Sequence, residues 1–135
     1  MSKVEVAVNL FNCSDYNILI VDDEVALASL IAEELADYGY EIFVANCGND
    51  ALAIIAAENI TLVISDMKMP NGSGVELVEK AVELSPRPPI FLMMTGFADI
   101  TEDELKKKGA ERLLEKPIKC DELAKIIEME IGAKK

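Results

Sequence analysis

The chain has 135 residues, 51% hydrophobic and 28% charged, and this composition excludes a disordered, collagen-like or low-complexity protein. Lys and Arg total 13 against 25 Asp and Glu, so the net charge of −12 makes nucleic acid and anionic membrane surfaces unfavourable direct partners. The sequence contains no His, which excludes a Ser-His-Asp hydrolase and a zinc enzyme with histidine ligands.

The predicted elements alternate between strands and helices along the chain. Residues 1–16 precede this pattern, and apolar side chains alternate between Val4 and Leu10. This alternation leaves three possibilities for residues 1–16: an added strand, a partner-binding tail or a loose tail. Short apolar runs typical of strands that are buried on both faces then follow at residues 17–21, 41–45, 61–65, 90–94 and 112–114.

Apolar side chains at helical spacing separate these runs. The first helix is expected to turn Ala28, Ile31, Leu35 and Tyr38 inward and to end at Gly39. Residues 51–57, rich in Ala and Ile, predict a short second helix.

Two sequences of the capping-box type predict where the third and fourth helices begin. Ser73 with Glu76 opens a helix that runs to about residue 84, and Thr101 with Glu104 opens a short helix that Gly109 ends. In the last helix the residues expected to face inward are Leu123, Ile126, Ile127 and Ile131.

Alternating strands and helices predict a doubly wound (βα)5 fold of the α/β class, a three-layer sandwich around a five-stranded parallel sheet. Among the common orders for such sheets, 2-1-3-4-5 suits five strands best. We predict one domain at residues 17–131, an N-terminal extension at 1–16 and a C-terminal tail at 132–135. In such folds the functional residues collect beyond the carboxyl ends of the strands.

The sequence indicates a cytoplasmic protein. Cys13, Cys47 and Cys120 are far apart in the sequence and form no CxxC pair, which favours small hydrophobic residues in a reducing compartment over disulfides or a metal site. The N-terminus lacks the features of a signal peptide, and no apolar stretch reaches the roughly 18 residues that span a bilayer.

Charged and hydroxyl side chains follow four of the predicted strands. Asp22 and Asp23 follow the first strand, Asp66 the third and Thr95 the fourth, while Lys116 follows the fifth. Because the carboxyl ends of parallel strands meet at one edge of the sheet, these residues are expected to converge there. Each alone is also compatible with a turn or a helix cap, but their convergence on one edge is not explained by turn chemistry.

Three carboxylates placed close together repel one another unless a cation neutralises them. Oxygen ligands of this kind suit a hard ion such as Mg²⁺, which also accepts a phosphoryl oxygen. A carboxylate can take a phosphoryl group as an aspartyl phosphate when a metal, a fixed cation and a hydrogen-bond donor offset the charge. Asp66 with Mg²⁺, Lys116 and Thr95 would provide these parts.

At these residues the chain resembles the receiver domain of two-component response regulators, the CheY-like family with a flavodoxin-like fold. The matching stretches are ILIVDDE, GNDAL, LVISDMKMPNGSGVEL, MMTGFAD and LLEKPI, within residues 17–131. The resemblance implies that the phosphoacceptor is Asp66 and that the phosphoryl donor is a sensor histidine kinase or a histidine phosphotransferase. Because the sequence shows no output domain after the last predicted helix, we expect a single-domain regulator. It implies an output by protein–protein contact or phosphorelay to an unidentified target, and no conventional enzyme activity beyond the protein's own phosphorylation and dephosphorylation.

The resemblance also assigns roles around the phosphoacceptor. Asp22 and Asp23 match the acidic pair that holds Mg²⁺, and Asp66 with the backbone carbonyl of Lys68 completes the protein ligands. Thr95 matches the switch hydroxyl, and Lys116 matches the lysine that pairs with the phosphoryl group. The family often has a cis peptide bond at the position of Lys116 and the following proline.

Three features depart from the family pattern, and one of them is the N-terminal extension at residues 1–16. Leu113 stands where receivers usually carry the Tyr or Phe that swings inward upon activation, which predicts a muted or rerouted change on the face of the fourth helix, fifth strand and fifth helix. Lys68 and Phe97 match positions that flank the path of the attacking water in the family. They predict either slow autodephosphorylation or no effect on the rate, in which case the two side chains only cover the loop surface.

Other functions fit the sequence less well. A flavodoxin-like electron carrier needs a phosphate cradle after the first strand, where Asp22, Asp23 and Glu24 would repel a flavin phosphate. An aspartyl phosphatase begins with D-x-D, which is absent at this position. A receiver that serves as a docking module without phosphorylation would be favoured if an acidic-pair residue, the acceptor or the lysine were missing, and all are present.

Overall fold

The computed structural model describes residues 12–69, 72–96 and 100–133. Residues 1–11, with the alternating segment from Val4 to Leu10, lie outside the described residues, and so does Phe97. The elements in chain order are η1 (Cys13–Asp15), β1 (Asn17–Val21), α2 (Val25–Asp37), β2 (Glu41–Ala45), α3 (Gly48–Ala57), β3 (Leu62–Asp66), β4 (Lys68–Met69), β5 (Gly72–Ser73), α4 (Gly74–Leu84), β6 (Ile90–Thr95), α5 (Glu102–Lys108), β7 (Arg112–Glu115) and α6 (Cys120–Ala133).

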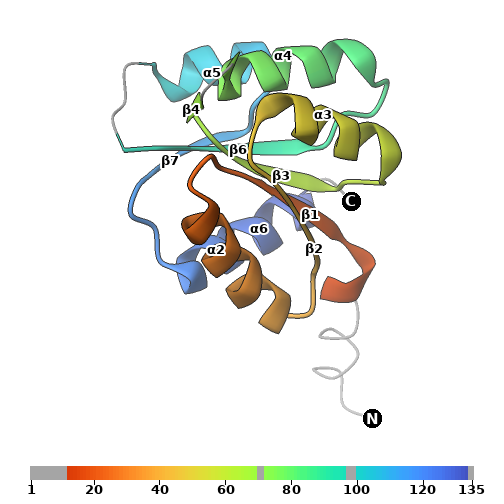
Figure 1. The fold of residues 1–135 in the computed structure, drawn as a ribbon, viewed down its shortest axis with the longest axis vertical. Coiled ribbons are helices and arrows are strands. Elements are labelled where there is room, and N and C mark those ends of the chain that lie inside the picture. The colour runs from red at the N-terminus through yellow and green to blue at the C-terminus, as the bar shows by residue number, and fades with distance from the viewer. Residues whose placement is uncertain (1–11, 70–71, 97–99, 134–135) are drawn as a thin grey trace.

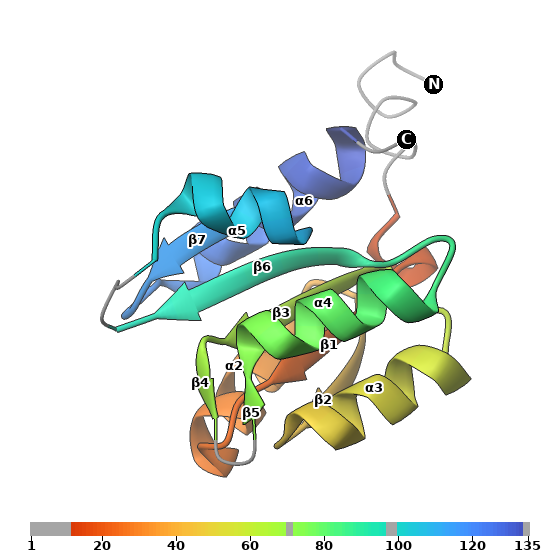
Figure 2. The ribbon, with the colours of Figure 1, turned by 90° about the horizontal axis from the view of Figure 1, so that it is seen from above.

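The predicted architecture is confirmed. The five long strands form one sheet in the order β2-β1-β3-β6-β7, which is 2-1-3-4-5 when these strands are counted along the chain, and every pair is parallel. Helices α2 and α6 cover one face of the sheet, and α3, α4 and α5 cover the other (Figure 1). The short antiparallel pair β4 and β5 lies apart from this sheet, beside the start of α4 (Figure 2).

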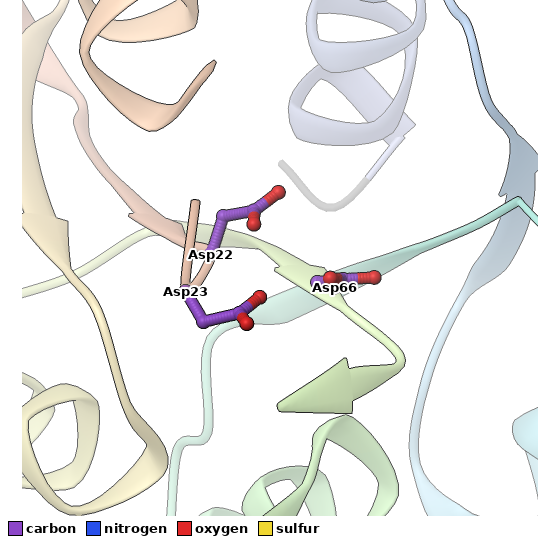
Figure 3. A group of neighbouring side chains, drawn as sticks. All are labelled: Asp22, Asp23 and Asp66. Atoms are coloured by element: carbon purple, nitrogen blue, oxygen red, sulfur yellow. The ribbon is translucent and has the colours of Figure 1, made fainter. Parts of the chain in front are cut away.

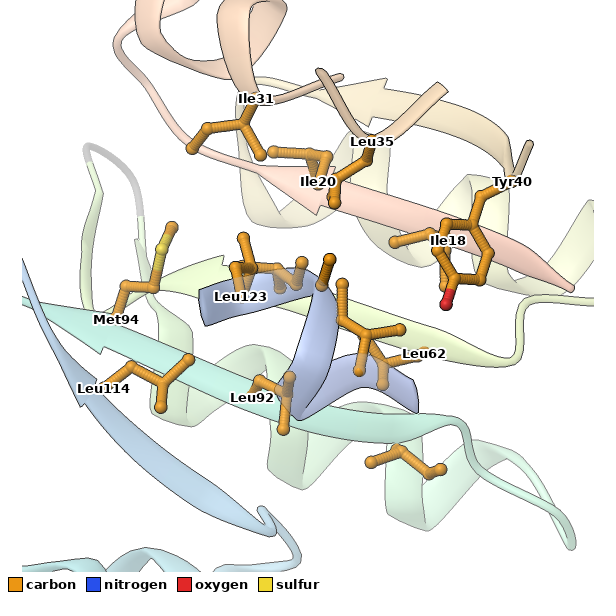
Figure 4. Close-up of a cluster of buried hydrophobic side chains, with 14 of the residues drawn as sticks. Ile18, Ile20, Ile31, Leu35, Tyr40, Leu62, Leu92, Met94, Leu114 and Leu123 are labelled. Atoms are coloured by element: carbon orange, nitrogen blue, oxygen red, sulfur yellow. The ribbon is translucent and has the colours of Figure 1, made fainter. Parts of the chain in front are cut away.

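The sheet is buried on both faces because its strands are almost entirely apolar. One cluster packs the sheet against α2 and α6, with Ile18, Ile20, Leu62 and Leu92 among its buried side chains (Figure 4). A second cluster fills the space under α3, α4 and α5, where Phe91 is fully buried. Because both faces of the sheet are covered by apolar clusters, the strands appear in the sequence as continuous hydrophobic runs.

The ends of several predicted elements differ from the structure. The third strand begins at Leu62 rather than Thr61, and α3 begins at Gly48, three residues before the predicted start. Tyr38 does not face inward: α2 ends at Asp37, the chain turns through Gly39 at φ 107°, and the Tyr38 side chain is 49% exposed. Ile126 is only partly buried, whereas Leu123, Ile127 and Ile131 are buried as expected.

Both predicted helix starts are confirmed by their caps. The Ser73 side chain accepts a hydrogen bond from the backbone N–H of Glu76, and Thr101 with Glu104 forms a complete capping box. At the other end of α5, Gly109 adopts a left-handed conformation with φ 114°. These caps satisfy backbone groups that helix ends would otherwise leave unpaired.

Helix α5 is tied to strand β7 by the side chain of Glu102. The Glu102 carboxylate accepts a hydrogen bond from the backbone N–H of Leu113 at 3.1 Å and lies 3.4 Å from Lys106 Nζ. The hydrogen bond from Leu113 and the neighbouring Lys106 together hold the pKa of Glu102 below its ordinary value. A lowered pKa stabilises the folded state above the pKa of an unfolded Glu, about 4.3, and this contribution is lost as the pH falls through the folded-state pKa.

We therefore expect Glu102→Ala to lower the free energy of unfolding by less than about 1 kcal/mol at pH 7, because the pair is exposed. The difference from the wild type should shrink as the pH falls below 4. Urea unfolding at pH 7 and pH 3 measures both values. Glu102→Gln, whose amide oxygen can still accept from Leu113, serves as the control and should lose less at pH 7. A loss in the Ala variant that is independent of pH would contradict this account.

Candidate functional site

The predicted acidic residues meet at the carboxyl edge of the sheet. Val21 pairs with Ser65 in the β1–β3 register, so the residues that follow them, Asp22 and Asp66, lie at adjacent strand ends. Oxygen atoms of Asp22, Asp23 and Asp66 all lie within 4.8 Å of one another, and Figure 3 shows the carboxylates gathered at one place. Asp22 and Asp66 are buried, whereas Asp23 is exposed.

Asp22 is fixed from several directions. Its carboxylate Oδ1 accepts the backbone N–H of Glu24 at 2.9 Å, and its own N–H donates to the carbonyl of Ala45 at 3.1 Å. The side-chain amide of Asn46 donates to the backbone carbonyl of Asp22 at 2.9 Å. These bonds hold a buried charge in a single orientation, which an ion-binding site requires.

Lys116 supplies the cation that faces these carboxylates. Its Nζ lies 3.4 Å from Asp22 Oδ2 and 3.4 Å from Asp66 Oδ1, and its backbone N–H donates to the carbonyl of Thr95 at 2.8 Å. The Lys116–Pro117 peptide bond is cis, as the family resemblance implied. Burial lowers the pKa of Lys116, but the nearby charges of Asp22 and Asp66 outweigh burial and raise the pKa above its ordinary value.

The pKa of the Asp66 carboxyl is raised above its ordinary value. Burial raises the pKa of its carboxyl and the charge of Asp22 raises it further, while Lys116 and the backbone N–H of Lys68 act in the opposite direction. The net result is a raised pKa, so the ionised form of Asp66 destabilises the folded state at neutral pH. A bound cation would relieve this destabilisation.

Thr95 completes the set of predicted residues at this edge. It ends strand β6, next to β3, and its side chain is buried. Asp66 pairs with Met94 in the β3–β6 register, and the N–H of Met67 donates to the carbonyl of Met94 at 2.9 Å. The structure therefore places the Thr95 residue at the strand end next to Asp66 and Lys116.

Gly74 was not among the predicted site residues, but it packs directly against the backbone of Asp66. A side chain at this position would collide with the backbone carbonyl oxygen of Asp66 and come within 2.6 Å of Met93 Cε. The N–H of Gly74 donates to the carbonyl of Met67 at 2.9 Å. Only glycine lets α4 begin this close to the end of β3. A glycine at the start of a helix does not by itself show in the sequence that the helix lies this close to a strand.

The structure describes Leu113 and Lys68, two of the residues that depart from the family pattern. Leu113 is half-buried against the apolar cluster under α3, α4 and α5, and its N–H is bound by Glu102. Lys68 is exposed at the start of β4. The predicted role of the Lys68 backbone carbonyl as a metal ligand, and that of Phe97, stay predictions.

The donor set fits a hard divalent cation. Three carboxylates converge without sulfur or imidazole ligands, as Mg²⁺ and Ca²⁺ prefer. In the part of the chain that the structure describes, no helix is long and apolar enough to cross a bilayer.

Comparison with known proteins gives a consistent family. Residues 18–128 match the family model described as the response regulator receiver domain. A probable transcriptional regulator, ycf29 of Pyropia yezoensis, is 36% identical over 117 residues, which cover 83% of this chain and 51% of that protein. The chain thus spans about half the length of ycf29, and it spans a quarter of the ZraR regulators of Salmonella.

Solved structures agree with the family model. A CheY-like response regulator receiver domain protein from Methanospirillum hungatei JF-1 has a TM-score of 0.81 and 32% identity, covering 87% of this chain and 94% of that one. A response regulator protein from Burkholderia pseudomallei, with a phosphorylated aspartic acid, calcium ion and citrate, has a TM-score of 0.73 and 28% identity, covering 88% and 74%.

Proposed function

This chain belongs to the family of response regulator receiver domains, and we propose that it signals by accepting a phosphoryl group on Asp66 in a reaction that depends on Mg²⁺. The observation that carries the proposal is the position of Asp66, whose Oδ1 lies 3.4 Å from Lys116 Nζ and which has a carboxylate oxygen within 4.8 Å of oxygen atoms of Asp22 and Asp23. The donor is a sensor histidine kinase or a histidine phosphotransferase, and the protein acts in the cytoplasm.

Asp66, Lys116 and Thr95 have different roles in the transfer of the phosphoryl group. A carboxylate oxygen of Asp66 attacks the phosphorus, a new O–P bond forms, and the P–N bond to the imidazole of the donor breaks with its electron pair staying on nitrogen. The ammonium group of Lys116 stabilises the negative charge on the transferred group, and the hydroxyl of Thr95 donates a hydrogen bond to it. The carbonyl of Thr95, which accepts the N–H of Lys116, keeps both residues in register.

Asp22 and Asp23, with Asp66, would hold Mg²⁺, and the backbone carbonyl of Lys68 would complete the protein ligands. When bound, Mg²⁺ neutralises the carboxylates and the phosphoryl oxygens at this edge. The carboxylate of the buried Asp22 is oriented by the N–H of Glu24, which donates to it at 2.9 Å.

A phosphodonor protein must approach Asp66 over the edge where an apolar groove opens beside Lys116. The groove has a volume of about 420 Å³, and Leu30 and Ile31 of α2 and Ile118 after β7 line it. Leu30 is 52% exposed. We expect the domain that carries the phosphohistidine to cover this groove while its imidazole reaches Asp66.

The signal leaves the protein by a contact with another protein or by onward transfer of the phosphoryl group. Its own catalysis is limited to phosphorylation and dephosphorylation of Asp66, which does not make it a conventional enzyme. A docking module without phosphorylation is the second candidate, but it offers no reason for Lys116 to be placed between two buried carboxylates.

Beryllofluoride, a stable mimic of the phosphoryl group, tests this function. In the presence of Mg²⁺ we expect large NMR shifts of the amides around Asp22, Asp66, Thr95 and Lys116. Because Leu113 replaces the usual aromatic, we expect smaller shifts along α5, β7 and α6. Asp66→Asn, the control, should show no shifts. Absence of any shift in the wild type would favour the docking module, and shifts on α5, β7 and α6 as large as elsewhere would contradict the muted response.

A further inference from the structure

The side chain of Asn46 holds the turn that carries the acidic pair. Asn46 follows the edge strand β2, and its amide Nδ2 donates to the backbone carbonyl of Asp22 at 2.9 Å. The preceding residue, Ala45, accepts the N–H of Asp22 at 3.1 Å. Ala45, the last residue of β2, and the following Asn46 therefore bind the N–H and the carbonyl of the Asp22 backbone. The end of β2 and the end of β1 are more than twenty residues apart in sequence.

The bond from Asn46 fixes the peptide group that joins Asp22 to Asp23. A peptide group is planar, so a hydrogen bond to the Asp22 carbonyl also sets the direction in which the chain enters Asp23. The Asp22 carboxylate has its own partners in the N–H of Glu24 and Lys116 Nζ. Asp23 is exposed, so the position of its carboxylate beside Asp22 and Asp66 depends on its backbone.

We infer that Asn46 is a positioning residue for cation binding, which acts on Asp23 through the Asp22–Asp23 peptide group and touches neither the cation nor the phosphoryl group. This inference rests on the proposed function. It extends the site to strand β2, the edge strand, which carries none of the acidic, hydroxyl or ammonium groups of the site. A change at the end of β2 would thereby alter cation affinity while every ligand stays in the chain.

The test measures binding of Mn²⁺, a divalent probe with a direct electron paramagnetic resonance signal, to the full chain without a phosphodonor. Asn46→Ala should weaken Mn²⁺ binding about tenfold, as loss of a group that orients metal ligands typically does. Asn49→Ala, three residues further on at an exposed position of α3, should bind as the wild type does. The melting temperatures of the two variants in EDTA should agree within a few degrees.

A double-mutant cycle with Asp23→Asn tests the route of the effect. If Asn46 acts through Asp23, Asn46→Ala should change the affinity of the Asp23→Asn variant by less than about twofold, since coupled residues are not additive. A further tenfold loss would overturn the inference, and so would wild-type affinity in Asn46→Ala. A melting temperature of Asn46→Ala in EDTA that is lower than that of Asn49→Ala by more than a few degrees would make the role merely structural and overturn it as well. A wild type that binds no Mn²⁺ or Mg²⁺ would refute the cation-dependent function itself.

Discussion

Gly74→Ala is expected to lower the free energy of unfolding by about 3 kcal/mol, at the upper end of the usual cost of overpacking. The new methyl group would collide with the carbonyl oxygen of Asp66, a backbone atom in the end of a buried strand that cannot rotate away, and would approach Met93 Cε to 2.6 Å. Thermal unfolding followed by circular dichroism should show a midpoint lower by roughly 10 °C.

The same substitution at Gly132 is the matched control. Among the residues that the structure describes, and apart from the chain neighbours of Gly132 and the backbone of its own helix, no atom lies within 4 Å of a methyl group added at Gly132, in the exposed last turn of α6. Gly132→Ala should therefore be neutral or slightly stabilising, since Ala favours helix over Gly by up to about 1 kcal/mol. Because Gly74→Ala moves the backbone of the acceptor, its phosphoryl uptake should also fall. A Gly74→Ala protein as stable as Gly132→Ala would show that α4 can shift away from β3 at no cost.

Lys116→Met is expected to cost about 3 kcal/mol of stability in EDTA, because it leaves the buried carboxylate of Asp22 and that of Asp66 without their cation. Methionine retains most of the aliphatic length of the side chain, so the loss reports the charge. The raised pKa of Lys116 contributes stability that is fully present below the pKa of an unfolded Lys and is lost as the pH rises through the folded-state pKa. At pH 7 the full contribution is therefore present.

Chemical unfolding at pH 7, once with EDTA and once with saturating Mg²⁺, measures this loss of stability. The loss should be smaller with Mg²⁺, because the bound ion would neutralise the carboxylates of Asp22 and Asp66 in place of Lys116. The rate of phosphoryl uptake should fall by a factor of about 100 to 1,000, as for the loss of one group that stabilises transition-state charge. Lys125→Met, at an exposed position of α6 outside the groove, is the control. Equal stability and equal rates in the two variants would exclude the assigned role of Lys116.

The fold was predictable because its signals are local. Parallel strands covered on both faces appear as short apolar runs, and the runs at residues 17–21 and 41–45 match β1 and β2. The start of α3 was missed because Gly48, Asn49 and Asp50 carry no apolar side chain, although they are helical. Strands β4 and β5 have two residues each, too few for any periodicity. Tyr38 was misplaced because helical spacing does not show that the helix ends at the preceding residue.

The candidate site was predictable only in part. The topology brings the ends of β1, β3, β6 and β7 to one edge, which is why Asp22, Asp66 and Lys116 were expected together, and the ion pairs bear out their proximity. The contributions of Gly74 and Asn46 were not predictable, because each depends on the approach of a distant backbone segment rather than on a local pattern.

The central claim is that Asp66 takes up a phosphoryl group, and the most direct measurement is the intact mass of the protein after incubation with acetyl phosphate and Mg²⁺. We expect one added phosphoryl group in the wild type and none in Asp66→Asn or in the presence of EDTA. Asp23→Asn, which keeps the acceptor but weakens the cation site, should be labelled more slowly. An adduct of the same size in Asp66→Asn would contradict the assignment of Asp66 as the acceptor, and uptake unaffected by EDTA would contradict the dependence on a cation.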